Sequence, residues 1–62
     1  MKIVVDAMGG DYAPESAVEG AVMAAREYET EIILTGLSDK IHAVLGRFDP
    51  DHNLPILVVH AD

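Results

Sequence analysis

The sequence predicts an α/β fold: a β-α-β-α-β segment of a parallel, doubly wound sheet. Three short apolar runs, at residues 3–5, 32–34 and 56–59, are rich in β-branched side chains and have the length of strands. Two longer segments between these runs repeat their apolar residues at helical spacing. Strands that alternate with helices of this length indicate a parallel sheet with right-handed crossovers.

The first strand is predicted over residues 2–6, and a turn containing Gly9 and Gly10 follows it over residues 7–13. Pro14 is expected to open the first helix, because proline is favoured at the first helical position. An alternative start uses Ser16 and Glu19, which match the Ser-x-x-Glu capping box. The apolar face of this helix consists of Val18, Ala21, Val22, Ala25 and Tyr28.

The second strand is predicted over residues 31–36 and ends at Gly36. Ser38 is expected to be the N-cap of the second helix. Residues 49–53 form a loop by composition, and the third strand follows over residues 56–59. The apolar face of the second helix consists of Ile41, Val44, Leu45 and Phe48.

The predicted strands are continuous apolar runs, which is typical of parallel sheets that are covered on both faces. Two helices cannot cover both faces of three strands and also protect the edges of the sheet. A chain of 62 residues is also close to the lower size limit for a domain that folds alone. We therefore expect residues 1–62 to be the N-terminal part of a single larger α/β domain, with no internal boundary.

Composition narrows the function classes. The formal net charge of −7, with only four Lys and Arg residues, disfavours a nucleic-acid interface, which needs clustered cations. The absence of cysteine excludes disulfides and Cys-ligated zinc. No polybasic membrane anchor is present, and Asp6 interrupts the apolar stretch that a signal peptide would need. We expect a cytoplasmic protein.

Ligands of open α/β sheets bind beyond the carboxyl ends of the strands. Residues 6–13, 35–37 and 60–62 are predicted to lie there. Gly9 and Gly10 allow a close backbone approach and lead into a helix N-terminus, where free N–H groups favour an anion. Two interpretations remain open: the loop is an anion cradle, or it is only a tight turn in which Asp11 folds back to cap the helix.

Asp6 and His60 are the other candidate site residues. Asp6 either fixes the loop by hydrogen bonds or faces a substrate or a metal, although two carboxylates are weak evidence for magnesium. Asp6 and Asp11 are not both expected to contact a phosphate directly, because their charges would repel it. His60 is either a hydrogen-bonded structural residue or a catalytic base. Ser38 is better explained as a helix-start residue than as a nucleophile.

Residues 5–15, Val-Asp-Ala-Met-Gly-Gly-Asp-Tyr-Ala-Pro-Glu, resemble the N-terminal signature of the bacterial phosphate acyltransferase of phospholipid synthesis, the PlsX family. The resemblance implies an enzyme that transfers a fatty acyl group from acyl carrier protein to inorganic phosphate, giving acyl phosphate. It also implies a fold like that of isocitrate and isopropylmalate dehydrogenases. The implied enzyme is a cytosolic homodimer with at most peripheral membrane association, and it uses no metal or nucleotide cofactor.

Under this resemblance, Gly9 and Gly10 shape the phosphate pocket, Asp6 and Asp11 order the loop, and His60 lines the same cleft. The catalytic residues are not identified, and the isolated chain is expected to be inactive. One alternative is a non-catalytic, truncated α/β module that docks on a partner. Another is a different anion-binding α/β enzyme of related fold, such as a dehydrogenase, although the dinucleotide fingerprint is missing.

Overall fold

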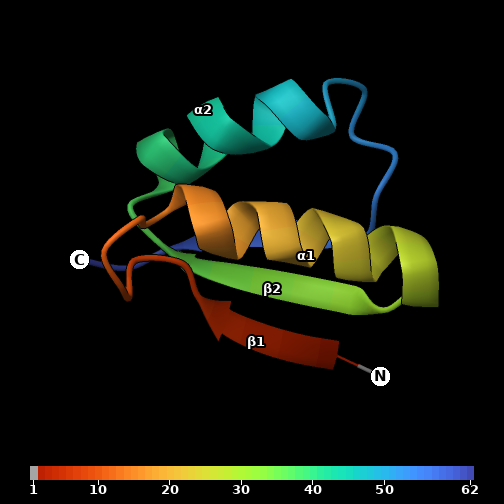
Figure 1. Ribbon diagram of the computed structural model, residues 1–62, viewed down its shortest axis with the longest axis horizontal. Helices are drawn as coiled ribbons and strands as arrows, with labels where there is room; N and C mark the ends of the chain where they lie inside the picture. The colour runs from red at the N-terminus through yellow and green to blue at the C-terminus, as the bar shows by residue number, and fades with distance from the viewer. Residues whose placement is uncertain (1) are drawn as a thin grey trace.

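A computed structural model describes residues 2–62 and contains the five predicted elements in the predicted order (Figure 1). The third strand is one residue longer than predicted and includes His60. The elements are β1 (Lys2–Asp6), α1 (Glu15–Tyr28), β2 (Glu31–Gly36), α2 (Ser38–Phe48) and β3 (Ile56–His60).

The three strands form one parallel sheet in the order β1-β2-β3, as the sequence predicts. The register places Val4, Ile33 and Leu57 side by side in one row across the sheet. The next row, Val5, Leu34 and Val58, points to the opposite face, because successive side chains of a strand alternate between faces. The α/β class is confirmed, whereas the dehydrogenase-like family fold and the single larger domain remain predictions.

Both helices pack on the same face of the sheet (Figure 1). Consecutive crossovers of one hand, running in one direction across a parallel sheet, place their helices on one side. The apolar stripes of the two helices meet Ile32 and Leu34 of β2, which are almost fully buried. The core consists of Ala7, Val18, Ala21, Val22, Ala25, Ile32, Leu34, Ile41 and Leu45.

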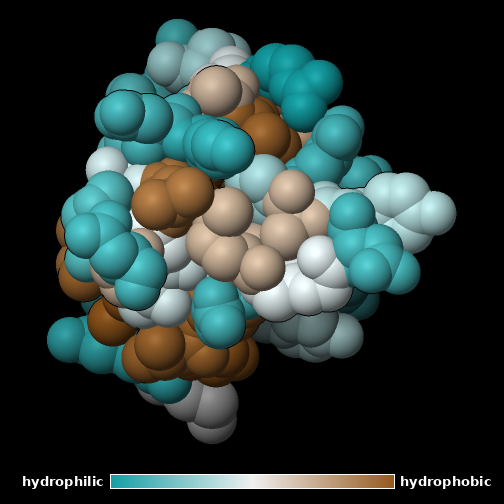
Figure 2. All heavy atoms as spheres, turned by 90° about the vertical axis from the view of Figure 1, so that its left-hand side faces the viewer, coloured by the Kyte–Doolittle hydropathy of each residue, from teal (hydrophilic) through white to brown (hydrophobic). Residues whose placement is uncertain are grey.

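The other face of the sheet is open. Val4, Leu57 and Val59 are 65%, 60% and 44% exposed, and Ile33 is half-buried. Figure 2 views the molecule from the end where the strands finish, and hydrophobic residues gather along its lower and left-hand margin, on the side away from the helices. The sheet therefore has one packed face and one exposed apolar face.

The predicted start of α1 and the predicted start of α2 each differ from the structure by one residue. Pro14 lies at the N-cap position, and α1 begins at Glu15. The preceding turn supplies the first bonds of the helix: the N–H of Ser16 donates to the Tyr12 carbonyl at 3.2 Å. The alternative capping box of Ser16 is not formed, because Ser16 already lies inside the helix and no side chain caps α1.

The loop between α2 and β3 is organised by a buried carboxylate. Asp49 is only 6% exposed, and its two oxygens accept hydrogen bonds from the backbone N–H groups of Asn53 (2.9 Å) and Leu54 (3.2 Å). An Asp side chain that bonds nearby backbone groups is a common turn-forming device. The loop thereby delivers the chain to the start of β3 in a defined conformation. None of the helices within residues 2–62 is long and apolar enough to cross a membrane.

Candidate functional site

A hollow of about 440 Å³ lies at the carboxyl ends of the three strands. We call it the carboxyl-end cleft. It receives residues from all three segments predicted to lie beyond the strand ends, but of the predicted site residues only Asp6 lines it. Its lining residues are Asp6, Met8, Thr35, Gly36, Leu37, Ala61 and Asp62.

Backbone hydrogen bonds hold the three strand ends together beyond the sheet itself. The N–H of Ala7 donates to the Thr35 carbonyl, and the N–H of Ala61 donates to the Gly36 carbonyl, both at 2.8 Å. Gly36 has a φ of +150° and no room for a side chain. A Cβ at this position would overlap Cγ of Met8 and lie 3.2 Å from Cδ1 of Ile41. The centre of the cleft therefore requires glycine at residue 36.

Asp6 lies in the cleft and also orders the loop after β1. Its Oδ1 accepts a hydrogen bond from the backbone N–H of Met8 at 3.0 Å. This bond favours the interpretation of Asp6 as a loop-fixing residue. Met8, to which the sequence assigns no role, lines the cleft because it packs directly over Gly36.

The glycine loop lies beside the cleft, and Gly9, Gly10 and Asp11 are not among the lining residues. Gly10 has a φ of +92°, a conformation that L-residues rarely adopt, and a Cβ there would meet nothing within 4 Å. Gly10 is therefore needed for its backbone conformation and is not crowded by neighbours. The predicted cap by Asp11 is not formed, because no side chain accepts a capping hydrogen bond at the start of α1.

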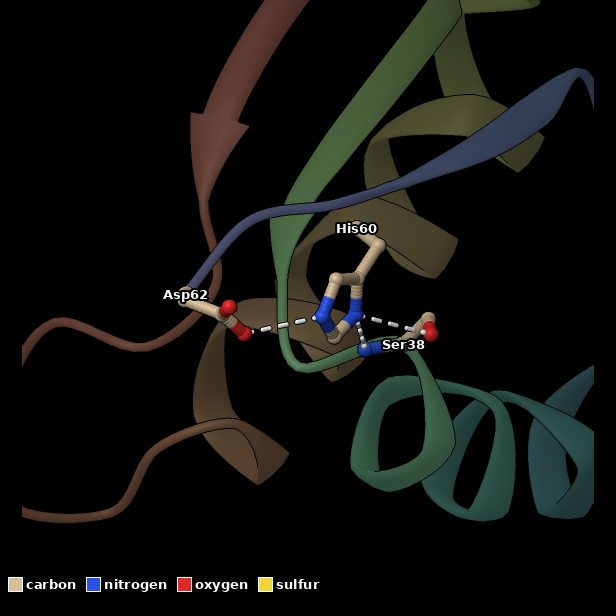
Figure 3. Close-up of polar contacts among 3 residues, drawn as sticks. All are labelled: Ser38, His60 and Asp62. Atoms are coloured by element: carbon tan, nitrogen blue, oxygen red, sulfur yellow. Dashed lines mark hydrogen bonds and ion pairs between the residues drawn. The ribbon is translucent and has the colours of Figure 1, made fainter.

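His60 lies at the end of β3, and its side chain contacts the start of α2 (Figure 3). Its Nδ1 lies 3.2 Å from the backbone nitrogen of Ser38 and 3.0 Å from Ser38 Oγ. Because a backbone N–H can only donate, Nδ1 accepts, and the ring proton is assigned to Nε2. Nε2 then donates to Asp62 Oδ1 at 2.9 Å. These hydrogen bonds favour the structural interpretation of His60, and the prediction that His60 lines the cleft is wrong, because it is not among the lining residues.

This contact corrects the prediction for Ser38. Leu37 occupies the N-cap position of α2, Ser38 is the first helical residue, and no local side chain caps the helix. His60 supplies the acceptor that the sequence assigns to the Ser38 side chain. The two residues are 22 positions apart, so no local pattern in the sequence signals this contact.

Ser38, His60 and Asp62 have the order of hydroxyl, imidazole and carboxylate found in serine nucleophile triads. Two observations favour a structural role instead. The lone pair of Nδ1 is shared between the Ser38 hydroxyl and the Ser38 backbone N–H. The Asp62 side chain is 90% exposed, so water competes for its hydrogen bonds. The geometry is that of a helix cap delivered by a distant residue.

The cleft carries negative charge. Asp6 and Asp62 line it, and no Lys or Arg is found among its lining residues within 2–62. Two of the cations are engaged elsewhere: Arg47 pairs with Glu15 at 3.1 Å, and Arg26 donates to the Phe48 carbonyl at 2.7 Å. In the same described range, no group of three or more His, Cys, Asp or Glu side chains could hold a metal ion. An anion bound in this cleft would need an additional positive charge.

Comparison with known proteins places the chain in a family. The family model described as "Fatty acid synthesis protein" matches residues 1–62. Phosphate acyltransferase of Pelotomaculum thermopropionicum is 55% identical over 47 residues, which cover 76% of this chain and 14% of that protein. Phosphate acyltransferases of Clostridioides difficile and Syntrophotalea carbinolica are 47% and 51% identical, over 97% and 95% of this chain and 17% of each relative. The chain spans about one sixth of the length of these relatives, and it belongs to the fatty acid synthesis protein family, whose curated relatives are named phosphate acyltransferases.

Proposed function

We propose that this chain forms part of an acyltransferase that moves a fatty acyl group from acyl carrier protein to inorganic phosphate, giving acyl phosphate for phospholipid synthesis. The observation that carries the proposal is family membership: 47% identity to a phosphate acyltransferase over 97% of the chain. Because the chain spans only 17% of that relative, the reaction belongs to the longer protein. Cytoplasmic location and a homodimeric state are parts of the same proposal.

In the proposed reaction, a phosphate oxygen attacks the thioester carbonyl carbon, a C–O bond forms, and the C–S bond breaks to release the carrier thiol. Positioning the phosphate and stabilising the tetrahedral oxyanion would supply most of the rate enhancement. The carboxyl-end cleft and the adjacent glycine loop are the proposed phosphate region of this chain. Gly9 and Gly10 would shape it, Asp6 would order the loop through its bond to Met8, and His60, by contacting Ser38, would hold the lining residue Leu37 in place.

The negative charge of the cleft means that a bound phosphate needs a compensating cation. Two carboxylates in the lining would repel phosphate unless a cation compensates for them. The lining residues within 2–62 offer no Lys or Arg. The positive charge is therefore proposed to come from residues of the longer protein outside this chain. For the same reason, we expect no phosphate-dependent release of acyl carrier protein by the isolated 62-residue chain.

The glycine loop can be tested by Gly10→Val in a full-length enzyme that carries this sequence as its first segment. Valine strongly disfavours the φ of +92° at this position, so the loop must rearrange. We expect a higher KM for phosphate, with a smaller change in kcat. Gly20→Val is the matched control, because residue 20 is an exposed position of α1 where a Cβ meets nothing within 4 Å. Unchanged phosphate kinetics in Gly10→Val would rule out the cradle. Robust turnover by the isolated chain would contradict the proposal that the reaction requires the rest of the longer protein.

A further inference from the structure

We propose that Met8 contacts the acyl group of the thioester substrate. Its side chain forms the floor of the carboxyl-end cleft, and the acyl carbons next to the reacting carbonyl would rest on it. The assignment rests on the proposed function and names the part of the substrate that this chain receives. Phosphate would then occupy the side of the proposed phosphate region that adjoins the glycine loop.

The charge of the carboxyl-end cleft favours the uncharged one of the two substrates. Asp6 and Asp62 line the cleft, and its lining residues within 2–62 include no Lys or Arg. Carboxylates repel an anion such as phosphate, whereas an acyl chain and its thioester carry no charge to be repelled. The surface that this chain contributes to the cleft therefore suits the acyl group better than it suits phosphate.

The cleft is also larger than phosphate requires. Its volume of about 440 Å³ falls within the range of sites that hold small organic molecules. A water molecule occupies about 30 Å³ of the liquid, and a phosphate ion is only a few times larger. Phosphate alone would leave most of the cleft unfilled, so there is room for several acyl carbons as well.

Met8 lies where the acyl carbons would meet the protein. The side chains of Met8 and Ile41 both lie over Gly36: a Cβ at residue 36 would be 3.1 Å from Sδ of Met8 and 3.2 Å from Cδ1 of Ile41. Ile41 is fully buried, whereas Met8 is half-buried and lines the cleft. Met8 therefore separates the cleft from the core, with one side against packed residues and the other facing the cleft.

The local structure fixes the backbone of Met8 and leaves its side chain adaptable. The backbone N–H of Met8 donates to Asp6 Oδ1 at 3.0 Å, which holds the residue just beyond the end of β1. Methionine is unbranched and flexible, so its thioether can adjust to apolar groups of different shape. Leu37 and Ala61 add further apolar surface to the lining. An acyl group in the cleft would thus meet an adjustable apolar surface on a fixed backbone.

Steady-state kinetics test the assignment in a full-length enzyme that carries this sequence as its first segment. Met8→Ala should lower kcat/KM for a straight-chain acyl thioester about tenfold, because apolar contacts are lost, and should leave the KM for phosphate unchanged. Met8→Leu nearly conserves the side-chain volume and should stay within about threefold of the parent enzyme. Met23→Ala is the matched control, since Met23 is 62% exposed on α1 and does not line the cleft.

A change in substrate preference distinguishes contact with the acyl group from general damage to the fold. The space left by Met8→Ala should accommodate a thioester that has a methyl branch beside its carbonyl, so the kcat/KM ratio of branched to straight substrate should rise about threefold or more. An unchanged ratio would overturn the assignment. A raised KM for phosphate with unchanged acyl kinetics would also overturn it, and so would equal effects of Met8→Ala and Met23→Ala.

Photo-crosslinking gives a readout that depends neither on turnover nor on a variant. An acyl-pantetheine thioester with a diazirine beside its carbonyl would be illuminated with the parent full-length enzyme, and mass spectrometry would locate the labelled residues. We expect label within residues 6–8 or 35–37, and label absent from both segments would overturn the assignment. Failure of the parent enzyme to form acyl phosphate would instead contradict the proposed function, so the two failures are distinguishable.

Discussion

The imidazole of His60, at the end of β3, accepts a hydrogen bond from the backbone N–H of Ser38, at the start of α2, over 3.2 Å. The two residues are 22 positions apart in sequence. Helix starts are usually satisfied by the residue just before them, but here the acceptor comes from the neighbouring strand. The contact fixes the Gly36–Leu37 corner that forms the centre of the carboxyl-end cleft.

Replacement of His60 tests this cap. His60→Ala removes the acceptor and should lower the free energy of unfolding by about 1 kcal/mol, the usual cost of losing a helix cap. His60→Asn places an amide oxygen near the position of Nδ1 and should recover part of that loss. Urea unfolding of the 62-residue chain, followed by circular dichroism, measures both variants. An Asn variant as unstable as the Ala variant would show that the acceptor at Nδ1 contributes nothing.

Gly36 should tolerate no side chain. Gly36→Ala places a Cβ against Met8 and Ile41 in a backbone conformation that L-residues rarely adopt, and should cost about 1–3 kcal/mol of unfolding free energy. Gly9→Ala is the control, because its Cβ would lie 4.0 Å from Asp6 Oδ2, an ordinary contact. We expect that variant to stay within about 0.5 kcal/mol of the parent chain.

The steric and backbone contributions at Gly36 can be separated. In a Met8→Ala background, the overlap with Met8 is removed while the φ of +150° remains. Chemical unfolding of the double variant should therefore show a smaller cost of Gly36→Ala than the parent background does. An identical cost in the two backgrounds would exclude the overlap with Met8 and leave the backbone conformation and the contact with Ile41 as the cause.

Substitution of Asp49 should lower the free energy of unfolding more than substitution of any other residue in the loop before β3. Asp49→Ala leaves the N–H groups of Asn53 and Leu54 without their acceptors and should cost about 1–3 kcal/mol of unfolding free energy. Asp49→Asn keeps one acceptor oxygen and should cost less. Amide hydrogen exchange at residues 53 and 54 provides a local readout. Unchanged protection in the Ala variant would mean that these two hydrogen bonds do not order the loop.

Much of the fold was predictable because the relevant signals are local. The β-branched runs and the helical spacing of residues such as Val18 and Val22 are visible within a few positions of the chain, so element type and order were correct. The position of the cleft, though not the residues that line it, was predictable for a related reason: parallel strands end at the same edge, so residues that follow different strands must meet there. Asp6, Thr35 and Asp62 do line one cleft.

The helix starts were not predictable in the same way, because capping groups compete. Ser38 has the right type for an N-cap, and Ser16 has a capping-box partner at Glu19, but neither caps its helix. A turn at Tyr12 supplies the first bond of α1, and His60 supplies the cap of α2. Which groups bond to the two helix starts therefore depends on how distant parts of the chain pack together.

The sequence by itself determined the alternation of strands and helices, their parallel arrangement and the edge at which the cleft forms, because each depends on spacing along the chain. Only the tertiary structure decided that both helices cover one face, that Met8 closes over Gly36 and that His60 reaches Ser38. Those relationships depend on distances between residues far apart in sequence, which packing against a shared sheet establishes and local pattern does not encode.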